Sequence, residues 1–179
     1  MDQGLRLTLQ PGQRLPNSSS WQISQGYLRM ISWTEQAEIL TVGVWGPGDL
    51  VMPTMIQDMP IELMALSDAI VVECRPTVEQ ERTFLLDHLQ QASTLLMLQR
   101  IRPIDERLFQ LLRWLAERFG QMRSAGITVP IESMQLTHRQ MGEIAGITRV
   151  SVTKAINRFR QEGRLIRVEL HDLIPHGMT

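Results

Sequence analysis

The residues with the clearest chemical purpose lie near the C-terminal end, at the beginning of a helix expected over residues 148–162. Arg149, Val150 and Lys154 fall on the N-terminal outer face of this helix, and Lys154 is the only lysine in the chain. An arginine can donate two hydrogen bonds to guanine, a lysine can donate to the same acceptors, and valine offers methyl groups to thymine. This pattern predicts a helix that reads base edges in the DNA major groove through these three residues.

Short hydroxyl and cationic side chains surround the base-reading positions. They are Thr137, His138, Arg139, Thr148 and Ser151. Donors of this kind contact phosphates, and such contacts fix the position of a protein on DNA without specifying the sequence. We therefore expect these five residues to contact the DNA backbone.

Two short helices, expected over residues 136–145 and 148–162, must position these side chains. Thr137 and Thr148 are of the residue type that caps a helix N-terminus, and Gly146 stands at the turn, where a positive φ is often required. Apolar residues fall on the facing sides of the two helices and can form a small core: Met141, Ile144, Ala145, Ile147, Val152 and Ile156. This spacing is typical of a helix-turn-helix.

The net charge of −1 hides an uneven distribution. Residues 1–76 carry four basic and eight acidic side chains, whereas residues 130–179 carry seven basic and five acidic ones. All seven of these basic residues lie between Arg139 and Arg167, where only Glu143 and Glu162 oppose them. A local cationic excess is what a phosphate-facing surface needs, although charge alone fits a solvated helix face equally well.

The first 76 residues are expected to form short strands. Alternating or β-branched apolar runs occur at residues 5–9, 21–24, 27–31, 39–42 and 69–72. Turn sequences separate them, namely Pro11-Gly12 and the run Gly46-Pro47-Gly48-Asp49. Closely spaced strands with such turns favour a small sandwich or barrel.

Large apolar side chains of this region are assigned to its core, and the alternative for the tryptophans is a pocket wall. They are Trp21, Trp33, Trp45, Met52, Met55, Met59 and Met64. Methionine fills irregular gaps, and the alternative for the methionines is a flexible contact surface for a partner or an apolar ligand. The single Cys74 excludes an intramolecular disulfide, and we expect it to be a small buried residue rather than a redox sensor.

After Pro76 the pattern becomes helical, with Thr77 as a possible cap and Pro103 as a breaker. We therefore divide the chain into a strand domain (1–76), a long helix (77–102) and a C-terminal domain (103–179). Four residues of the helix have the 4-3-4 spacing of a coiled-coil seam: Leu85, Leu89, Ala92 and Leu96. Such a seam predicts a homodimer, and the alternative is that this stripe packs on the protein's own strands.

The run LTHRQMGEIAGITRVSVTK, from Leu136 to Lys154, resembles the signature of the cyclic-AMP receptor and fumarate–nitrate regulator family, and its last seven residues are similar to the nitrogen-control regulators of cyanobacteria. The resemblance implies an α+β protein with an N-terminal, cupin-like β-roll, a long dimerisation helix and a C-terminal winged helix-turn-helix, with residues 164–174 as the wing. It further implies a homodimer that regulates transcription by binding a palindromic operator in double-stranded DNA, with RNA polymerase as another candidate partner.

Members of this family often bind a small effector in the β-roll, and they hold the phosphate of cyclic AMP with an Arg-Ser pair. That pair has no counterpart here, because no Lys, Arg or His occurs between Arg29 and Arg75, whereas seven acidic residues do. A buried phosphate would lack a cation in an acidic field, so cyclic AMP is not expected as an effector. Two alternatives stay open: a carboxylate effector bound by Arg82, Arg100 or Arg102, and a constitutive DNA-binding protein.

Other classes of protein are disfavoured. The four histidines lie outside the expected strands, so they do not supply the metal ligands of a cupin enzyme, and no Ser-His-Asp set, P-loop or His-Glu-x-x-His motif occurs. We expect no enzymatic activity, metal or cofactor. No segment approaches the roughly 20 apolar residues of a membrane span and no signal peptide is evident, so a cytoplasmic location without a membrane partner is expected.

Overall fold

The computed structural model describes residues 4–56 and 60–177, and the chain divides into two compact units, residues 1–95 and 96–179. The first unit contains β1 (Arg6–Leu9), β2 (Arg14–Leu15), β3 (Ser20–Gln25), β4 (Leu28–Trp33), β5 (Ile39–Trp45), β6 (Leu50–Val51), a short helix η1 (Pro53–Met55), β7 (Ile61–Ala65), β8 (Ala69–Cys74) and most of α1 (Val78–Arg100). The second unit contains α2 (Ile104–Phe119), β9 (Met122–Arg123), β10 (Gly126–Val129), α3 (His138–Ala145), α4 (Arg149–Gln161), β11 (Ile166–Val168) and β12 (His171–Pro175).

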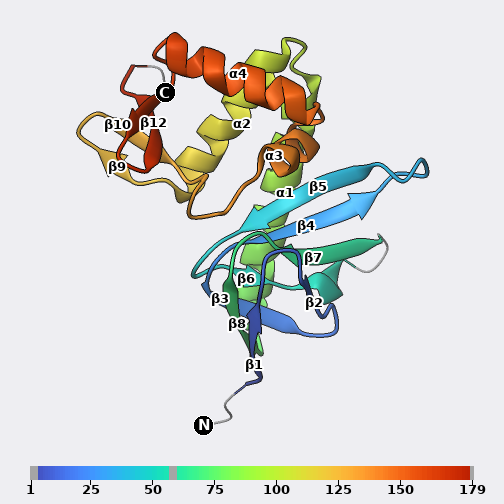
Figure 1. The fold of residues 1–179 in the computed structure, drawn as a ribbon. Coiled ribbons are helices and arrows are strands. Elements are labelled where there is room, and N and C mark those ends of the chain that lie inside the picture. The colour runs from blue at the N-terminus through green and yellow to red at the C-terminus, as the bar shows by residue number, and fades with distance from the viewer. Residues whose placement is uncertain (1–3, 57–59, 178–179) are drawn as a thin grey trace. The chain divides into compact units, whose positions relative to one another are not determined.

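The strands of the first unit form two four-stranded antiparallel sheets (Figure 1), with the orders β1-β8-β3-β6 and β2-β7-β4-β5. All five strands expected from the sequence are present. Strands β2, β6 and β7 were not expected. The first two have only two residues each, which is too short for a periodic pattern, and β7 lies in the region assigned to the methionine cluster.

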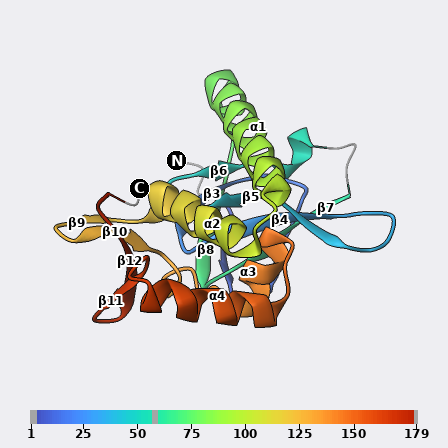
Figure 2. The same ribbon diagram turned by 90° about the horizontal axis from the view of Figure 1, so that it is seen from above.

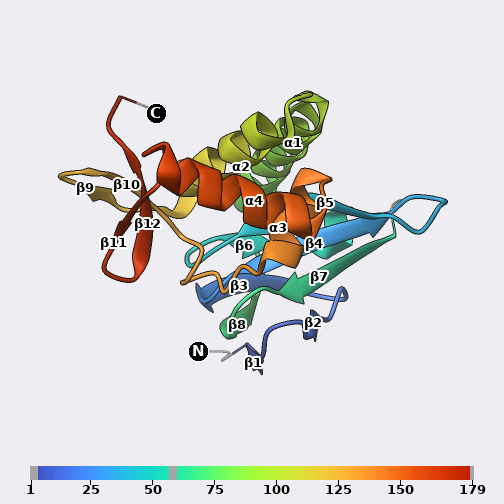
Figure 3. The same ribbon diagram turned by 45° about the horizontal axis from the view of Figure 1, so that its top comes forward.

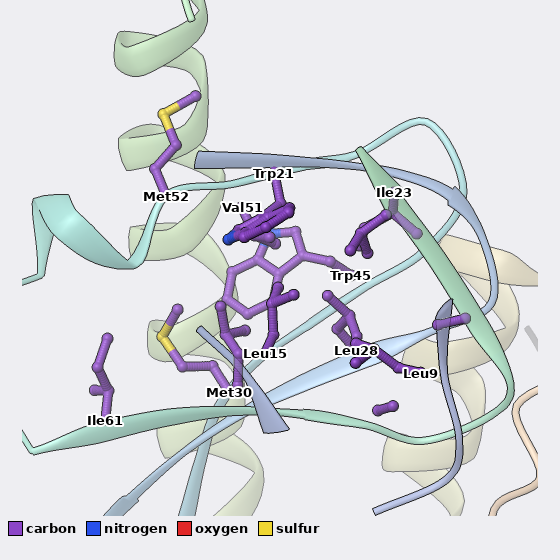
Figure 4. Close-up of a cluster of buried hydrophobic side chains, with 14 of the residues drawn as sticks. Leu9, Leu15, Trp21, Ile23, Leu28, Met30, Trp45, Val51, Met52 and Ile61 are labelled. Carbon is purple, nitrogen blue, oxygen red and sulfur yellow. The ribbon is translucent and has the colours of Figure 1, made fainter. Parts of the chain in front are cut away.

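The core of the first unit takes side chains from both sheets and from α1 (Figure 4). Trp21 and Trp45 are each 1% exposed, which confirms their assignment to the core, whereas Trp33 is half-buried. Gly43 makes room for the indole of Trp45, because a Cβ at that glycine would lie 2.1 Å from the ring. The interior is therefore filled by large rings, joined by aliphatic and thioether side chains.

The methionine prediction is only partly right. Met52 is fully buried, but Met64 is half-buried and Met55 is 38% exposed. Met55 belongs to η1, at the end of a loop where its side chain reaches solvent. Met59 lies outside the described residues.

Cys74, at the end of β8, is half-buried. Burial and the nearby Glu73 carboxylate raise the pKa of its thiol. A thiol held in its protonated form is a poor nucleophile, so the environment of Cys74 disfavours redox reactivity.

Helix α1 begins with a capping box, since Gln80 N–H donates to Thr77 Oγ1 at 3.3 Å and Thr77 N–H donates to Gln80 Oε1 at 2.8 Å. Its 23 residues extend for about 35 Å. One face is attached to the strands: Phe84 enters the core, and the buried Gln91 accepts a hydrogen bond from Val44 N–H at 2.7 Å. This face of the helix is thus held by both apolar packing and a buried hydrogen bond.

The second unit combines three helices with the antiparallel sheet β11-β12-β10-β9 (Figure 2). Helix α2 buries one apolar face, with Leu108, Leu111, Leu112 and Leu115 all inaccessible to solvent. It packs on β10, α3 and α4, where the rings of Phe109 and Phe159 meet edge to face at 5.4 Å. The expected α+β fold class is confirmed.

No helix in the described residues has the length and apolar character required to cross a bilayer. Across residues 4–56 and 60–177, His, Cys, Asp and Glu side chains do not gather in groups of three that could hold a metal ion.

Candidate nucleic-acid interface

Helices α3 and α4 and the turn between them form the helix-turn-helix expected from the sequence (Figure 3). Gly146 ends α3 in the left-handed region, with φ 65°, and its N–H donates to the Gly142 carbonyl oxygen. A Cβ at Gly142 would lie 2.7 Å from the Ile147 carbonyl oxygen, so this position also needs a glycine. The two glycines let the chain reverse tightly and bring α4 close to α3.

Five of the six residues expected to form the small core between the helices are buried, and the sixth is half-buried. Met141, Ile144, Ala145, Val152 and Ile156 are buried, and Ile147 is half-buried. Ala155 and Phe159 complete the core on the inner face of α4. Because this face is buried, the orientation of the outer face of α4 is fixed by packing.

The outer face of α4 carries the three predicted base-reading residues. Arg149 and Lys154 are exposed, and 60% of the surface of Val150 is exposed. An exposed valine beside two cations is not expected on a helix face that contacts only water. The structure thus leaves all three side chains accessible at the N-terminal end of α4.

Most cations of the helix-turn-helix and the following hairpin are already paired with carboxylates. Of the seven basic residues from Arg139 to Arg167, five form ion pairs: Arg139–Glu143, Arg158–Asp105, Arg160–Asp172, Arg164–Glu106, and Arg167 with Glu132 and Asp172. Within the described part of the chain, Arg149 and Lys154 have no such partner. Between Arg139 and Arg167 these two cations are therefore the ones whose charge no carboxylate offsets.

A buried carboxylate organises the C-terminal hairpin. The Asp172 side chain is 1% exposed and accepts hydrogen bonds from Arg160 Nη2 at 2.7 Å and from Arg167 Nη1 at 3.1 Å. Arg167 also bonds to Glu132, which precedes α3, and these bonds raise the pKa of its guanidinium. This network ties β12 to both α4 and the segment before α3. No role was expected for Asp172 from the sequence.

The predicted phosphate-contacting residues are close together, but several already have internal partners. Thr137 caps α3, where its Oγ1 accepts the Gln140 N–H at 3.2 Å and its hydroxyl also lies 3.0 Å from Gln140 Oε1. Thr148 caps α4 by accepting the Ser151 N–H at 3.1 Å, and the two hydroxyls lie 2.9 Å apart. Both predicted caps are confirmed. Their hydroxyl groups therefore hold the helix ends in place.

His138 and Arg139 occupy the first turn of α3. Arg139 is exposed and bonds to Glu143 at 3.1 Å, a surface pair of small energy that a phosphate can replace. His138 is half-buried, and its Nδ1 lies 2.8 Å from Thr153 Oγ1 on α4. Burial first, and then the positive charges of Arg149 and Arg160, lower the pKa of His138 below its usual value of 6.5. The imidazole is therefore neutral near pH 7.

The expected wing is present as the hairpin of β11 and β12. Its turn contains Glu169 with φ 53°, and the exposed apolar side chains around it are Ile166, Val168 and Leu170. Arg167, the cation nearest the turn, is paired with Glu132 and Asp172. The tip of this wing therefore differs from the outer face of α4 in having no unpaired cation among the described residues.

Comparison with known proteins supports the assignment of this region. A model of the Crp-like helix-turn-helix domain matches residues 106–174. The regulatory protein CysR of Synechococcus elongatus is 34% identical over 147 residues, which are 82% of this chain and 71% of that protein.

Solved structures share the fold over nearly the whole chain. FixK2 of Bradyrhizobium japonicum superposes with a TM-score of 0.74 at 14% identity, covering 98% of this chain and 93% of that one. A cyclic nucleotide-binding domain-containing protein of Listeria monocytogenes has a TM-score of 0.75 at 13% identity, covering 96% and 89%. At such low identities the likeness shows the fold alone, and it confirms an N-terminal β-roll followed by a C-terminal helix-turn-helix.

Proposed function

Because the chain belongs to the cyclic-AMP receptor and fumarate–nitrate regulator family of transcription regulators, we propose that it binds a palindromic operator as a homodimer and regulates transcription from it. Membership of the family confirms the resemblance of residues 136–154, and the curated relative is likewise a cyanobacterial regulator. The observation that carries the proposal is that Arg149 and Lys154 are exposed and lack carboxylate partners in the described residues.

In this proposal Arg149, Val150 and Lys154 read bases in the major groove. A cation without a local partner gives up no ion pair on binding, so its full charge is available to guanine or phosphate acceptors. Thr137, His138, Arg139, Thr148 and Ser151 contact phosphates from the N-terminal ends of α3 and α4, where the helix dipoles favour negative charge. These contacts position α4, and the three outer side chains then supply the specificity.

The dimer is proposed from the free face of α1. Leu85, Leu89 and Leu96 are 41%, 64% and 60% exposed, Ala92 is half-buried, and Leu86 and Met97 add further exposed apolar surface. A continuous apolar stripe of this kind is costly in water unless another surface covers it. Two copies packed along α1 would supply one recognition helix, α4, for each of two half-sites, which such dimers read about 34 Å apart. In this proposal residues 77–102 are the dimerisation helix, which separates a strand domain (1–76) from a DNA-binding domain (103–179).

Cyclic AMP is not proposed as an effector. The interior of the roll is filled by Trp21, Trp45, Met30 and Met52. The only cation from residue 16 to residue 74 is Arg29, and alternation with Leu28 and Met30 places it on the sheet face opposite the core. There its Nε donates to Thr41 Oγ1 at 2.8 Å. A filled interior supports a constitutive regulator that has no small-molecule effector.

A second candidate is a regulator with a small polar effector at the junction of β5 and α1. His88 stacks on Trp45 at 5.8 Å, and burial lowers its pKa. Trp45 Nε1 and His88 Nδ1 are buried without hydrogen-bond partners in the described residues. Because buried polar atoms are normally hydrogen-bonded, these two atoms are candidates for contact with a ligand. A thermal-shift screen of metabolites separates the candidates, because a constitutive regulator predicts no rise in Tm with any of them.

Regulation from a bound operator would act on RNA polymerase, by contact or by exclusion, and we place the protein in the cytoplasm with the chromosome.

The test of the main proposal is selection of binding sites from random DNA. We expect a palindrome with half-site centres about 10 base pairs apart, or a multiple of that. Arg149→Ala should cost about 1–3 kcal/mol and relax selection at one base of each half-site.

Arg158→Ala is the matched control, because Arg158 lies on the same helix but is paired with Asp105. It should leave base preference unchanged. Base preference that Arg149→Ala does not alter at any position would exclude the proposed role of Arg149, and failure to select any sequence would contradict the proposed function.

A further inference from the structure

The contact between His138 and Thr153 joins the first turn of α3 to the recognition helix. Thr153 Oγ1 donates to the Arg149 carbonyl oxygen at 3.1 Å, one turn back along α4. A hydroxyl group has a single proton, so an oxygen that donates to Arg149 must accept from His138 Nδ1, which lies 2.8 Å away. The proton of the neutral imidazole is therefore on Nδ1, and Nε2 carries a lone pair.

Burial first, and then the charged groups around the ring, lower the pKa of His138 and keep the ring neutral in the free protein. Arg149 and Arg160 on α4 oppose a positive charge on His138. A pocket of about 470 Å³ adjoins the ring and also contains Glu132 before α3, and Arg167 and Asp172 from the C-terminal hairpin. These carboxylates are already bonded to Arg160 and Arg167, so they offer the imidazole little compensating negative charge.

A neutral ring in this tautomer is unsuited to the role that the proposed function gives it. Phosphate oxygens only accept hydrogen bonds, and Nε2 with a lone pair also only accepts. His138 can donate to a phosphate only after Nε2 has gained a proton, and the resulting charge-assisted hydrogen bond is among the stronger kinds. The nearby phosphate then raises the pKa of the imidazole, because it stabilises the charged form.

We infer that Thr153 is a positioning residue that fixes the tautomer of His138, so that each DNA half-site takes up one proton when His138 contacts a phosphate. This inference rests on the proposed binding of DNA. Its sign follows from linkage: the protonated form is favoured in the complex, so operator affinity is greatest at low pH and falls as the pH rises through the pKa of the bound imidazole. The slope approaches about tenfold per pH unit for one half-site and about a hundredfold for a dimer.

The experiment measures affinity for the selected operator by fluorescence anisotropy from pH 6 to pH 8.5, at constant ionic strength. The wild type should lose affinity with rising pH. Thr153→Val, which removes the hydroxyl, should flatten the profile because the imidazole can then carry its proton on Nε2, whereas Thr153→Ser should keep the slope. His138→Arg, which is always charged, should bind at pH 8 as tightly as the wild type does at pH 6.

His171→Gln and His176→Gln are controls, since both histidines belong to the same unit and should leave the slope unchanged. The tautomer is read independently of DNA from the ¹⁵N chemical shifts of the His138 ring in the free protein. A proton on Nε2, or a wild-type affinity that does not change with pH, would overturn the inference while leaving the proposed function intact. Absence of operator binding at every pH would overturn both.

Discussion

The strand-rich unit and the helix-turn-helix unit treat their charged residues in opposite ways. In the first unit a single cation, Arg29, stands between residues 16 and 74, and it is buried beside Thr41 on the sheet face away from the core. In the second unit cations are abundant, but carboxylates offset five of the seven from Arg139 to Arg167. The capacity to bind an anion therefore depends on which charges remain unpaired and accessible, and not on how many are present.

The largest effect is expected from Leu89→Glu, which should abolish dimerisation through α1 and thereby weaken operator binding by the helix-turn-helix. A carboxylate in the proposed seam of α1 would face its copy across the two-fold axis, where a desolvated, unpaired charge is costly. We expect a monomer with a folded helix-turn-helix. Because a monomer loses the coupling between the two half-sites, its operator affinity should fall by about a hundredfold or more, which corresponds to about 2.7 kcal/mol. Light scattering and anisotropy measure the two effects.

Gln90→Glu is its matched control, because Gln90 is exposed on α1 next to Leu89 but outside the 4-3-4 stripe. It should remain a dimer. A wild type that is monomeric at micromolar concentration, or a Leu89→Glu variant that stays dimeric, would rule out this seam.

A smaller loss is expected from Asp172→Asn, which tests the pairing of cations in the second unit. The change removes the charge that holds Arg160 and Arg167, and we expect a loss of about 2 kcal/mol in the free energy of unfolding, since hydrogen bonds to charged groups have this magnitude. The released arginines should also strengthen binding to non-specific DNA and steepen its dependence on salt. Urea denaturation and salt titrations measure these changes.

Glu169→Gln is the control for Asp172→Asn, because it removes a charge from the exposed turn of the same hairpin. Equal effects of the two substitutions would mean that net charge, rather than the buried network, is responsible.

Gln91→Ala tests the attachment of α1 to the strands of the first unit. It leaves the buried Val44 N–H without its acceptor, and an orphaned backbone donor costs about 1–3 kcal/mol. Gln90→Ala, at the exposed neighbour, should change stability little. If both variants unfold at the same urea concentration as the wild type, the hydrogen bond to Val44 contributes nothing to the attachment.

The smallest expected effect is that of cyclic AMP. Isothermal titration should show no heat with millimolar nucleotide, because the roll interior is filled and its strands offer no cation on the core side. A micromolar Kd would show that the filled core opens to admit the ligand. The first unit would then bind an anion although it lacks an accessible, unpaired cation, and the contrast drawn between the two units would not hold.

The helix-turn-helix was largely predictable because its determinants are local. The caps Thr137 and Thr148 act on backbone groups three residues away, and Gly146 acts at its own position. The apolar spacing of α3 and α4 is likewise read within a few turns. Strands β2 and β6 could not be predicted in this way, because two residues carry no periodicity and only pairing with β7 and β3 makes them strands.

The sequence by itself determined the two helices, their caps, the turn between them and the outer position of Arg149, Val150 and Lys154. Only the tertiary structure decided which cations are free, because the carboxylate partners of Arg158, Arg160 and Arg164 lie 12 to 58 residues away along the chain. Arg167 likewise bonds to Glu132, 35 residues away, in addition to the nearby Asp172. The same is true of His138, whose tautomer depends on Thr153 fifteen residues later. Helix formation depends on nearest turns, whereas ion pairs and proton positions depend on which distant side chains the fold brings within hydrogen-bonding distance.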